Sequence, residues 1–147
     1  RLVQSRQQLM TAIVQAIVGA MRRDPKRPDA EVGLKTPSIH SDLLWTLHSN
    51  NNIAEALRRF GVSRTTRTLI LVRVAPPLDA GELVQHMTQL VDGTLQTRGL
   101  SLPSPALAWS ELGTAYKIQD TPAFQHPDTS QVDALICSMV ASKYVGA

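Results

Sequence analysis

A short helix with clear boundaries, residues 53–60, constrains the fold more than any other feature of the sequence. Asn52 stands at its N-cap position and Glu55 follows three residues later, an arrangement typical of a capping box in which the carboxylate reaches back to the cap. Gly61 ends the helix as a residue that tolerates the left-handed conformation. The apolar side chains on one face are Ile53, Ala56, Leu57 and Phe60. Two turns are not stable alone, so we expect this face to pack against other elements.

Two short apolar runs flank this helix and are predicted to be strands. They are residues 43–47 and 69–74, each bounded by polar turn residues, although periodicity alone does not exclude a buried helix. We expect a third strand at residues 116–118 and a further one within residues 95–102. With helices at both ends of the chain, the sequence predicts an α/β sandwich, in which a mixed, mainly antiparallel sheet packs with helices. Residues 1–147 are expected to form one domain.

Two further helices are predicted by the residues of their first turns. Asp79 and Glu82 mark the start of one, which we expect to end at residues 92–93. Ser130 and Asp133 mark the start of the other, which has the best amphipathic pattern in the chain. The inward positions of the first helix are Leu83, Met87, Leu90 and Val91. Those of the second are Val132, Leu135, Ile136, Met139 and Val140.

An N-terminal helix and several connections complete the expected organisation. Residues 9–21 form an apolar helix that must be covered on more than one face. Residues 22–33 are charged and broken by prolines, so we expect a mobile connector. Ser104 and Pro105 are typical of an N-cap followed by the first residue of a helix. Residues 121–127 are expected to be irregular.

The composition is typical of a globular domain. Apolar residues make up 43% of the chain and charged residues 18%, which argues against a disordered or membrane-spanning protein. The longest apolar segment, residues 9–21, is too short to cross a bilayer. The single Cys137 excludes an internal disulfide framework and is typical of a reducing compartment. We expect this thiol to be packed and inert.

The sequence carries none of the common motifs of catalysis or metal binding. It has no glycine-rich phosphate loop, no GxSxG elbow and no HExxH pair. The four histidines lack the spacing of metal ligands; they are His40, His48, His86 and His126. Acidic residues stand mostly at helix-cap positions, which explains them without general acid–base catalysis. We therefore predict no enzymatic activity, no cofactor and no metal.

Arginines gather in a part of the chain that lacks acidic residues. No Asp or Glu occurs from Ala56 to Leu78, and the arginines in this window are Arg58, Arg59, Arg64, Arg67 and Arg73. A solvated basic face is the interpretation that composition alone favours. A phosphate-facing patch is the functional alternative, because guanidinium groups suit phosphate oxygens. The net charge of +3 is too small to indicate strong nonspecific binding to nucleic acid.

The segment KTPSIHSDLLWTLHSNNNIAEALRRFGV, residues 35–62, resembles the motif of a known family. Its core, Asn-Ile-x-Glu-Ala-Leu-x-x-Phe-Gly from Asn52, is similar to that of the PRPK-binding protein (TPRKB-like, or Cgi-type) family, here of a fungal kind. Members of that family are small regulatory subunits of the KEOPS/EKC complex. Residues 9–21, 116–118 and 132–137 also match the family in the same order, so the resemblance covers most of the chain.

Several positions depart from the family motif. Pro37 stands where the family has arginine, and Asp42 stands in place of glutamate. His48 and Ser49 replace the common Ser-Pro pair. The strand and helix with which the family begins are not found in this sequence. We therefore expect that an N-terminal portion of the domain precedes Arg1.

The resemblance implies a non-catalytic subunit. Family members bind the N-lobe of the small atypical kinase/ATPase of the complex, and through it meet the ATPase-fold threonylcarbamoyl transferase subunit. The complex makes threonylcarbamoyl-adenosine in tRNA, and the small subunit supports recruitment of the tRNA, through its CCA end. Roles in telomere maintenance and transcription, and a location in nucleus and cytoplasm, go with the complex. Neither a membrane nor a small-molecule substrate is implied.

Two sets of site residues follow. The candidates for tRNA contact are the motif positions Lys35, Thr36, His40, Arg58 and Arg59, together with Arg64 from the arginine cluster. A kinase interface needs an apolar centre, and the candidates are Leu102, Leu112, Tyr116, Ile136, Met139 and Val140. Burial in the chain's own core is the alternative for each of these six. A free-standing tRNA-binding module that uses the arginines from Arg58 to Arg73, and a small-molecule enzyme, are the alternative functions.

Overall fold

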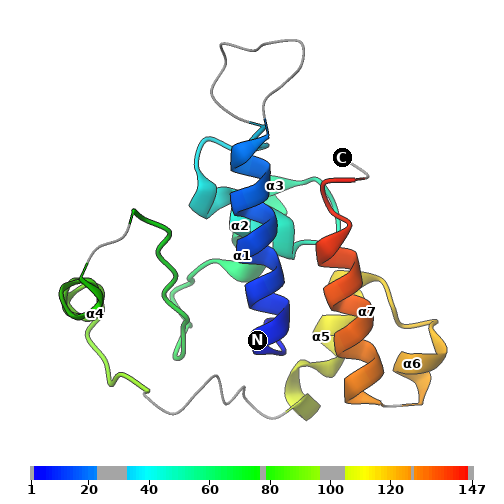
Figure 1. Cartoon of the computed structure of the whole chain (residues 1–147). Helices are drawn as coiled ribbons and strands as arrows, with labels where there is room; N and C mark the ends of the chain where they lie inside the picture. Colours follow the sequence, from blue (N-terminus) through cyan, green and yellow to red (C-terminus); the bar gives the residue numbers. More distant parts are fainter. Residues whose placement is uncertain (1, 23–32, 77–78, 97–104, 127, 146–147) are drawn as a thin grey trace.

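The computed structural model describes residues 2–22, 33–76, 79–96, 105–126 and 128–145. All regular structure in these ranges is helical, and no strand occurs in them. The helices are α1 (Arg6–Met21), α2 (Ile39–Leu47), α3 (Ile53–Phe60), α4 (Ala80–Gln89), α5 (Pro105–Tyr116), α6 (Pro122–Gln125) and α7 (Thr129–Ala141) (Figure 1). The predicted α/β sandwich with a mainly antiparallel sheet is therefore wrong.

Residues 43–47, predicted to be the first strand, lie in helix α2. The side chain of Ser38 accepts the N–H of Ser41, and the Ser41 side chain accepts the N–H of Ser38, which makes a capping box from two serines. The buried residues of α2 are Asp42, Leu43, Trp45, Thr46 and Leu47. A helix covered on several sides shows no polar face, so its apolar run cannot be told from a buried strand.

Residues 69–74, predicted to be the second strand, are extended but pair with no other strand among the described residues. Val72 packs against the core, and the N–H of Val74 donates to Nε2 of His40 at 3.1 Å. These contacts fix the segment to α2 without a sheet. Only residues 95 and 96 of the further predicted strand are described, and they are not in regular structure.

Residues 116–118, predicted to be the third strand, form the end of α5. Tyr116 is the last helical residue, and Lys117 follows in the left-handed region with φ 56°. The N–H of Ile118 donates to the carbonyl of Gly113 at 3.1 Å, which is the hydrogen bond of a Schellman helix end. The prediction failed because glycine usually marks this conformation, and here a lysine adopts it.

Helix α3 begins and ends where the sequence predicted, but its caps differ. Asn52 accepts the N–H of Glu55 at 3.1 Å, as expected, whereas the N–H of Asn52 donates to the Asn50 side chain at 2.8 Å. Glu55 therefore does not complete a capping box. Gly61 has φ −76°, which is not left-handed. A Cβ atom there would overlap the carbonyl oxygen of Leu57, so space rather than a dihedral angle explains this glycine.

The C-terminal helix confirms the predicted apolar face but not the predicted start. Asp128, not Ser130, is the N-cap of α7, and it accepts the N–H groups of Ser130 and Gln131 at 3.0 and 3.2 Å. Val132, Ile136 and Val140 are buried, and Leu135 and Met139 pack against the core. Residues 121–127, expected to be irregular, contain the short helix α6 behind Thr121.

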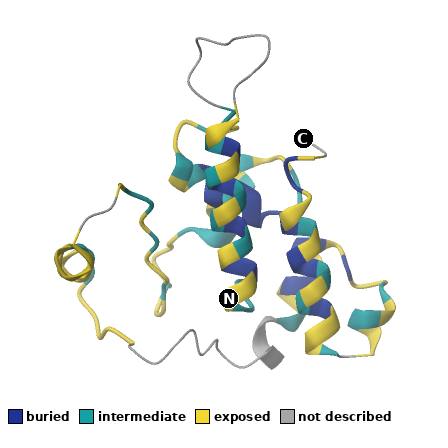
Figure 2. Ribbon diagram, in the orientation of Figure 1, coloured by how far each residue is buried: buried dark blue, intermediate teal, exposed yellow. Residues whose placement is uncertain are grey.

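The core lies where α1 packs against α2 and α7, with α5 supplying further side chains (Figures 1 and 2). Its main side chains are Leu9, Ala12, Ala16, Leu43, Leu47, Leu112, Tyr116, Val132, Ile136 and Val140. Gly19 of α1 lies against the ring of Tyr144, and a Cβ atom there would overlap that ring. The opposite side of α1 is exposed at Met10, Val14 and Val18, although covering on more than one face was expected.

Helix α4 stands apart from the other helices (Figure 1). Its predicted cap is confirmed, since Asp79 accepts the N–H groups of Gly81 and Glu82 at 2.7 and 3.2 Å. None of its residues is buried, and Leu90, which follows it, is 76% exposed (Figure 2). The predicted inward packing of this face is therefore wrong for Leu90, whereas Leu83, Met87 and Val91 are partly covered and none of the four is buried.

Several predictions concern residues outside the described ranges. These are the connector residues 23–32, the cap at Ser104 and the candidate interface residue Leu102. Pro105, expected at the first turn of a helix, is the first residue of α5. No helix in the described ranges is long and apolar enough to span a membrane.

Candidate functional site

A surface pocket of about 390 Å³ opens between the turn that follows α2 and the C-terminal end of α7. It is lined by Thr46, His48, Ser49, Asn50, Asn51, Tyr116, Met139, Val140, Ser142 and Lys143. Residues 48–52 form the turn, which we call the asparagine turn, and they belong to the motif that carries the family resemblance. The pocket therefore joins the most distinctive part of the sequence to the last helix.

Lys143 holds the asparagine turn against α7. Its Nζ donates to the carbonyl oxygens of His48 and Asn50 at 2.8 and 2.6 Å, and it lies 4.5 Å from the ring centroid of Trp45. Burial lowers the pKa of Lys143 to about 8, while the two carbonyls and the aromatic ring favour the charged amine. These contacts occupy the amine within the fold and give this lysine a structural role.

Tyr144 fixes the same end of α7 to α2. Its hydroxyl donates to Oδ2 of Asp42, and its ring meets that of Trp45 edge-on, with centroids 5.4 Å apart. The other carboxylate oxygen of Asp42 accepts the N–H of Lys35 at 2.9 Å. Burial, and then the Asp42 carboxylate, raise the pKa of the Tyr144 hydroxyl. Asp42, one of the departures from the family motif, is thus a buried anchor for two segments.

His48 is buried beneath the turn rather than offered to a ligand. Its Nδ1 accepts the N–H of Asn50 at 3.2 Å, and Phe60 packs edge-on against its ring. Its Nε2 has no hydrogen-bond partner and lies 4.0 Å from Oε1 of Glu55. Burial lowers the pKa of His48. Within the described residues, no group of three His, Cys, Asp or Glu side chains is placed to bind a metal.

Glu55 neutralises part of the predicted basic patch. Its Oε1 lies 2.8 Å from both Nε and Nη2 of Arg59 and 3.6 Å from Nη2 of Arg58. Its Oε2 accepts a hydrogen bond from the Asn50 side chain at 3.2 Å. The hydrogen bonds from Arg59 and Asn50 lower the pKa of Glu55. The acid-free window of the sequence begins one residue after Glu55, so the sequence pattern does not include this carboxylate.

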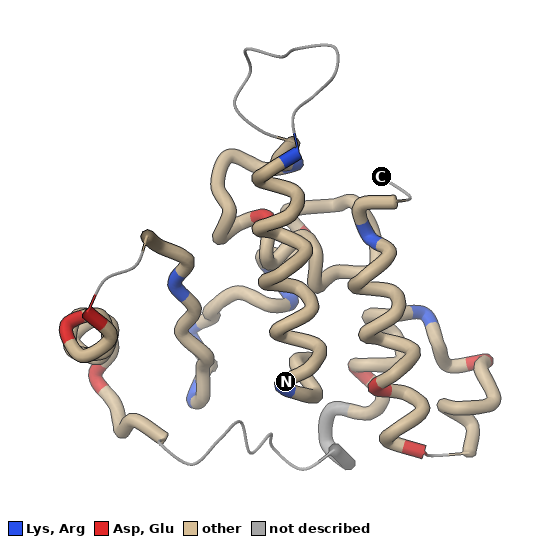
Figure 3. Tube along the Cα trace, in the orientation of Figure 1, with Lys and Arg blue, Asp and Glu red and all other residues tan. Residues whose placement is uncertain are grey.

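The residues predicted to contact tRNA fall into two groups. Lys35 and Thr36 precede α2, and His40 lies in its first turn, with the Thr36 hydroxyl donating to the carbonyl of Ser38 at 3.0 Å. The second group comprises Arg58 and Arg59 on α3 and Arg64 beyond it. Arg58 and Arg64 are exposed, whereas Arg59 is half-buried. Figure 3 shows basic residues along the extended segment that follows α3. Contact with tRNA stays a prediction.

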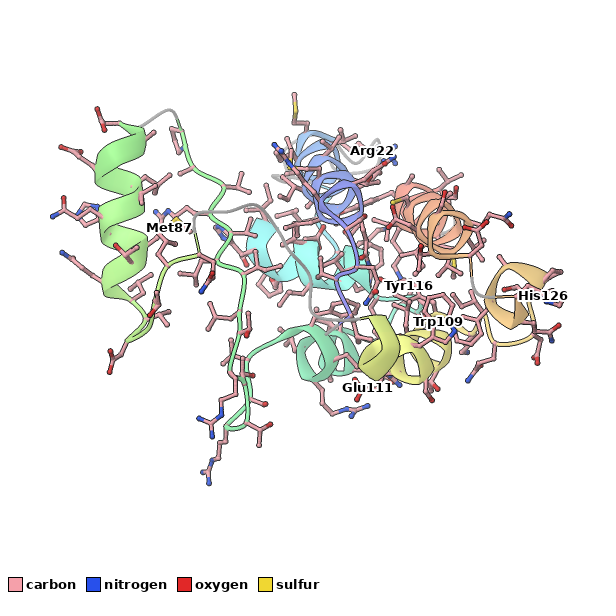
Figure 4. The ribbon with its side chains drawn as sticks, turned by 90° about the horizontal axis from the view of Figure 1, so that it is seen from below. Arg22, Met87, Trp109, Glu111, Tyr116 and His126 are labelled. Atoms are coloured by element: carbon pink, nitrogen blue, oxygen red, sulfur yellow. The ribbon has the colours of Figure 1, made fainter. Side chains whose placement is uncertain are left out.

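The residues predicted to contact the kinase lie mostly inside the chain. Leu112, Tyr116, Ile136 and Val140 are buried, with exposed fractions of 0, 2, 0 and 1%. The Tyr116 hydroxyl donates to the carbonyl of Leu47 at 2.6 Å and accepts from Gln8 at 2.7 Å, between the helices (Figure 4). Met139 is partly exposed at the pocket, and Leu102 lies outside the described residues. Kinase contact stays a prediction, with Met139 the most accessible of the described candidates.

A comparison with protein-family models shows to which family this chain belongs. The family model described as "Kinase binding protein CGI-121" matches residues 1–144. The chain belongs to the CGI-121 family. This confirms the resemblance that the motif around Asn52 indicated.

Several curated fungal subunits named CGI121 are similar to this chain. The EKC/KEOPS complex subunit CGI121 of Gibberella zeae is 35% identical over 98 residues, which cover 62% of this chain and 45% of that protein. The subunit of Aspergillus terreus is 38% identical over 63 residues, covering 42% of this chain and 32% of that protein. The subunit of Neurospora crassa is 24% identical over 130 residues, covering 74% and 63%. The chain thus spans less than two thirds of the length of these relatives.

Proposed function

We propose that this chain is a non-catalytic subunit that binds the N-lobe of a small atypical kinase/ATPase within an EKC/KEOPS complex. The observation that carries the proposal is the match to the kinase binding protein CGI-121 family over residues 1–144. The names of the fungal relatives, which are subunits of that complex, support it. Through the kinase, the chain would meet the ATPase-fold threonylcarbamoyl transferase subunit.

The pocket face is our candidate for the kinase interface. Met139 supplies partly exposed apolar surface to its lining, and Ser49, Asn51 and Ser142 supply polar groups. Protein interfaces usually combine apolar surface with polar groups around it. The amine of Lys143 at this face already binds two backbone carbonyls, those of His48 and Asn50. This arrangement suits docking better than chemistry on a small molecule.

Substitution at Met139 tests the kinase proposal. Met139→Glu places a charge on the apolar part of the pocket lining, so we expect it to weaken kinase binding at least tenfold, about 1.4 kcal/mol or more. Ser138→Glu adds the same charge at the neighbouring exposed position and is expected to leave affinity nearly unchanged. Met139→Leu should bind like the unaltered chain. Affinity is measured by calorimetry, and thermal melts check that each variant folds. Lack of binding between the unaltered chain and the kinase at low salt would overturn the proposal.

A role in tRNA recruitment is the second candidate function. Arg64, Arg67 and Arg73 are exposed along an extended segment that carries no carboxylate, which favours contact with a phosphate backbone. We propose that this segment, with Arg58 and Arg59, supports recruitment of tRNA through its CCA end for threonylcarbamoyl-adenosine modification. The alternative is that the chain is a free-standing tRNA-binding module, which acts without the complex.

Paired substitutions test the tRNA role. Arg64→Ala with Arg67→Ala should weaken tRNA binding more than Arg58→Ala with Arg59→Ala, because Glu55 already pairs with the second two. Binding should also fall as salt rises, since counterion release drives it. A tRNA that lacks its CCA end should bind less tightly than intact tRNA. Equal affinity for all variants and both tRNAs would remove the proposal.

The cellular setting follows from membership in the complex. We propose that the chain acts in nucleus and cytoplasm, and that links to telomere maintenance and transcription arise through the complex rather than through a separate site. A fluorescent fusion in fungal cells measures its location. Exclusion of the fusion from both nucleus and cytoplasm would contradict this proposal.

A further inference from the structure

Two regions of this chain, one face of α1 and the surroundings of α4, present apolar side chains to solvent. On α1, Met10, Val14 and Val18 are spaced four residues apart on one face and are 46, 51 and 38% exposed. Helix α4 has no buried residue, and Val84 and Leu90 are 50 and 76% exposed. Neither face belongs to the pocket or to the asparagine turn, so the proposed function leaves both unexplained.

The two helices have suitable lengths. The exposed face of α1 runs over eight residue steps from Met10 to Val18, and α4 is ten residues long, Ala80–Gln89. At a rise of about 1.5 Å per residue, the face of α1 is about 12 Å long and α4 is about 15 Å long. One helix could therefore cover the other along its whole apolar length.

The two segments also carry opposite charge. Residues 2–22 contain Arg6 and Arg22 and no Asp or Glu. Residues 79–96 contain Asp79, Glu82 and Asp92 and no Lys or Arg, and Figure 3 shows acidic residues at α4. In each segment the charges flank the apolar face, so the pairing would place cations near carboxylates around an apolar centre. Such complementarity favours association of these two helices over association of either with its own kind.

The α4 of the same chain is poorly placed to cover α1. Residues 61–76 lie between α4 and the pair α1 and α2, both in Figure 1 and in the perpendicular view of Figure 4. Two contacts hold this segment in place, the packing of Val72 on the core and the hydrogen bond from Val74 to His40. Closure within one chain would have to displace the segment. Figure 4 also shows Met87 on the side of α4 that faces it.

We propose that α4 of one copy packs on the exposed face of α1 of a second copy. The contact is made twice, because the α4 of the second copy packs on α1 of the first, which gives a dimer with two-fold symmetry. Each helix pair alone is a small interface that binds weakly, and the doubled contact makes the association tighter. The inference does not depend on kinase or tRNA binding.

The mass of the purified chain in solution tests this dimer. Light scattering over a roughly hundredfold range of concentration should show the mass rise from monomer towards dimer, as mass action requires. Val14→Glu and Leu90→Glu should each keep the chain monomeric over the whole range. Ala134→Glu is the matched control, because it places the same charge at an exposed position of α7. It should dimerise like the unaltered chain, and circular dichroism checks the helix content of all variants.

Mixing the two variants identifies which faces meet. A Val14→Glu chain keeps an intact α4, and a Leu90→Glu chain keeps an intact α1. Their mixture restores one of the two contacts, so we expect a dimer that forms at higher concentration than the unaltered dimer. An unaltered chain that stays monomeric throughout would overturn the proposal. So would variants that still dimerise alone, or a mixture that stays monomeric, since that result indicates like faces pairing with like.

Discussion

Helices α3 and α4 begin in the same way and have very different surroundings. Each begins at a side-chain cap, Asn52 for α3 and Asp79 for α4, and each carries a predicted apolar face. Helix α3 packs against α2, and its Ala56 is buried. Helix α4 has no buried residue. Caps and amphipathic spacing therefore specify where a helix starts and which side is apolar, but not what covers that side.

Long-range polar contacts account for the difference. The asparagine turn that leads into α3 is held by Lys143, which lies more than ninety positions later in the chain. Glu55 and Asn50 then tie the turn to the helix itself. The described residues offer α4 no comparable anchor beyond its own cap. Fixed position in this fold thus follows from side chains that bind distant backbone groups.

The largest expected difference is between a leucine-to-alanine substitution in the buried core and the same substitution at an exposed position near α4. Leu112→Ala removes a fully buried side chain and should reduce the free energy of unfolding by about 2–5 kcal/mol. Leu90→Ala, at a position 76% exposed beyond α4, should change it by no more than about 0.5 kcal/mol. Urea denaturation at a concentration where the chain is monomeric measures both. Similar losses for the two variants would show that α4 is packed after all.

A second prediction removes the anchor of the asparagine turn. Lys143→Met leaves two backbone carbonyls without their donor, so we expect a loss of about 1–3 kcal/mol. Lys117→Met, at an exposed lysine, is the control and should cost little. A loss no larger than that of the control would mean that the turn does not need Lys143.

The lowered pKa of Lys143 adds a pH signature to the same anchor. Between pH 8 and 10.5 the unfolded chain binds more protons at this amine than the folded chain does, so stability from this group rises with pH in that window. Lys143→Met should lack this rise. Urea midpoints measured across the window for both chains test it, and parallel pH profiles would contradict it.

A smaller effect is expected at His48, because its ring is buried and its pKa is lowered. As the pH falls below 6.5, the unfolded chain takes up a proton that the folded chain resists, so stability decreases. His48→Gln should flatten the profile of stability below pH 6.5. A profile as steep as that of the unaltered chain would contradict the buried, neutral state of His48.

The smallest predicted effect concerns a local helix end. Lys117 adopts φ 56°, a conformation that glycine adopts without the clash of a Cβ atom. Lys117→Gly should stabilise the chain by about 0.5–1 kcal/mol, since part of the gain is offset by the greater freedom of glycine in the unfolded state. Thermal melts measure the change. A loss of stability would mean that the left-handed geometry at this position is not retained in solution.

The sequence predicted local features well and the overall architecture poorly. The bounds of α3, the cap of α4 and the apolar face of α7 all follow from spacing and first-turn residues, and the structure confirms them. The fold class was wrong because α2 is buried on several sides and therefore resembles a strand in its pattern. The end of α5 was also missed, because Lys117 occupies the position where a glycine usually marks such a helix end.

Only one part of the candidate site could be predicted from the sequence, the part that lies within a contiguous motif. The asparagine turn belongs to the segment that identified the family, and the family match confirms that identification. Lys143 and Tyr144 were missed, because no local pattern indicates that they bind His48 and Asp42. A lysine and a tyrosine side by side near the end of a helix are unremarkable until the fold brings the asparagine turn beside them.

The bond between Tyr144 and Asp42 joins positions 102 residues apart, and that between Gln8 and Tyr116 joins positions 108 apart. During synthesis, helices α1 and α2 leave the ribosome long before the groups that complete their surroundings exist. Until then Asp42 and Gln8 have only their nearby partners, the N–H groups of Lys35 and Gln4 and the carbonyl of Leu2. The apolar sides of these two helices stay open to other nascent chains until translation has passed Tyr144.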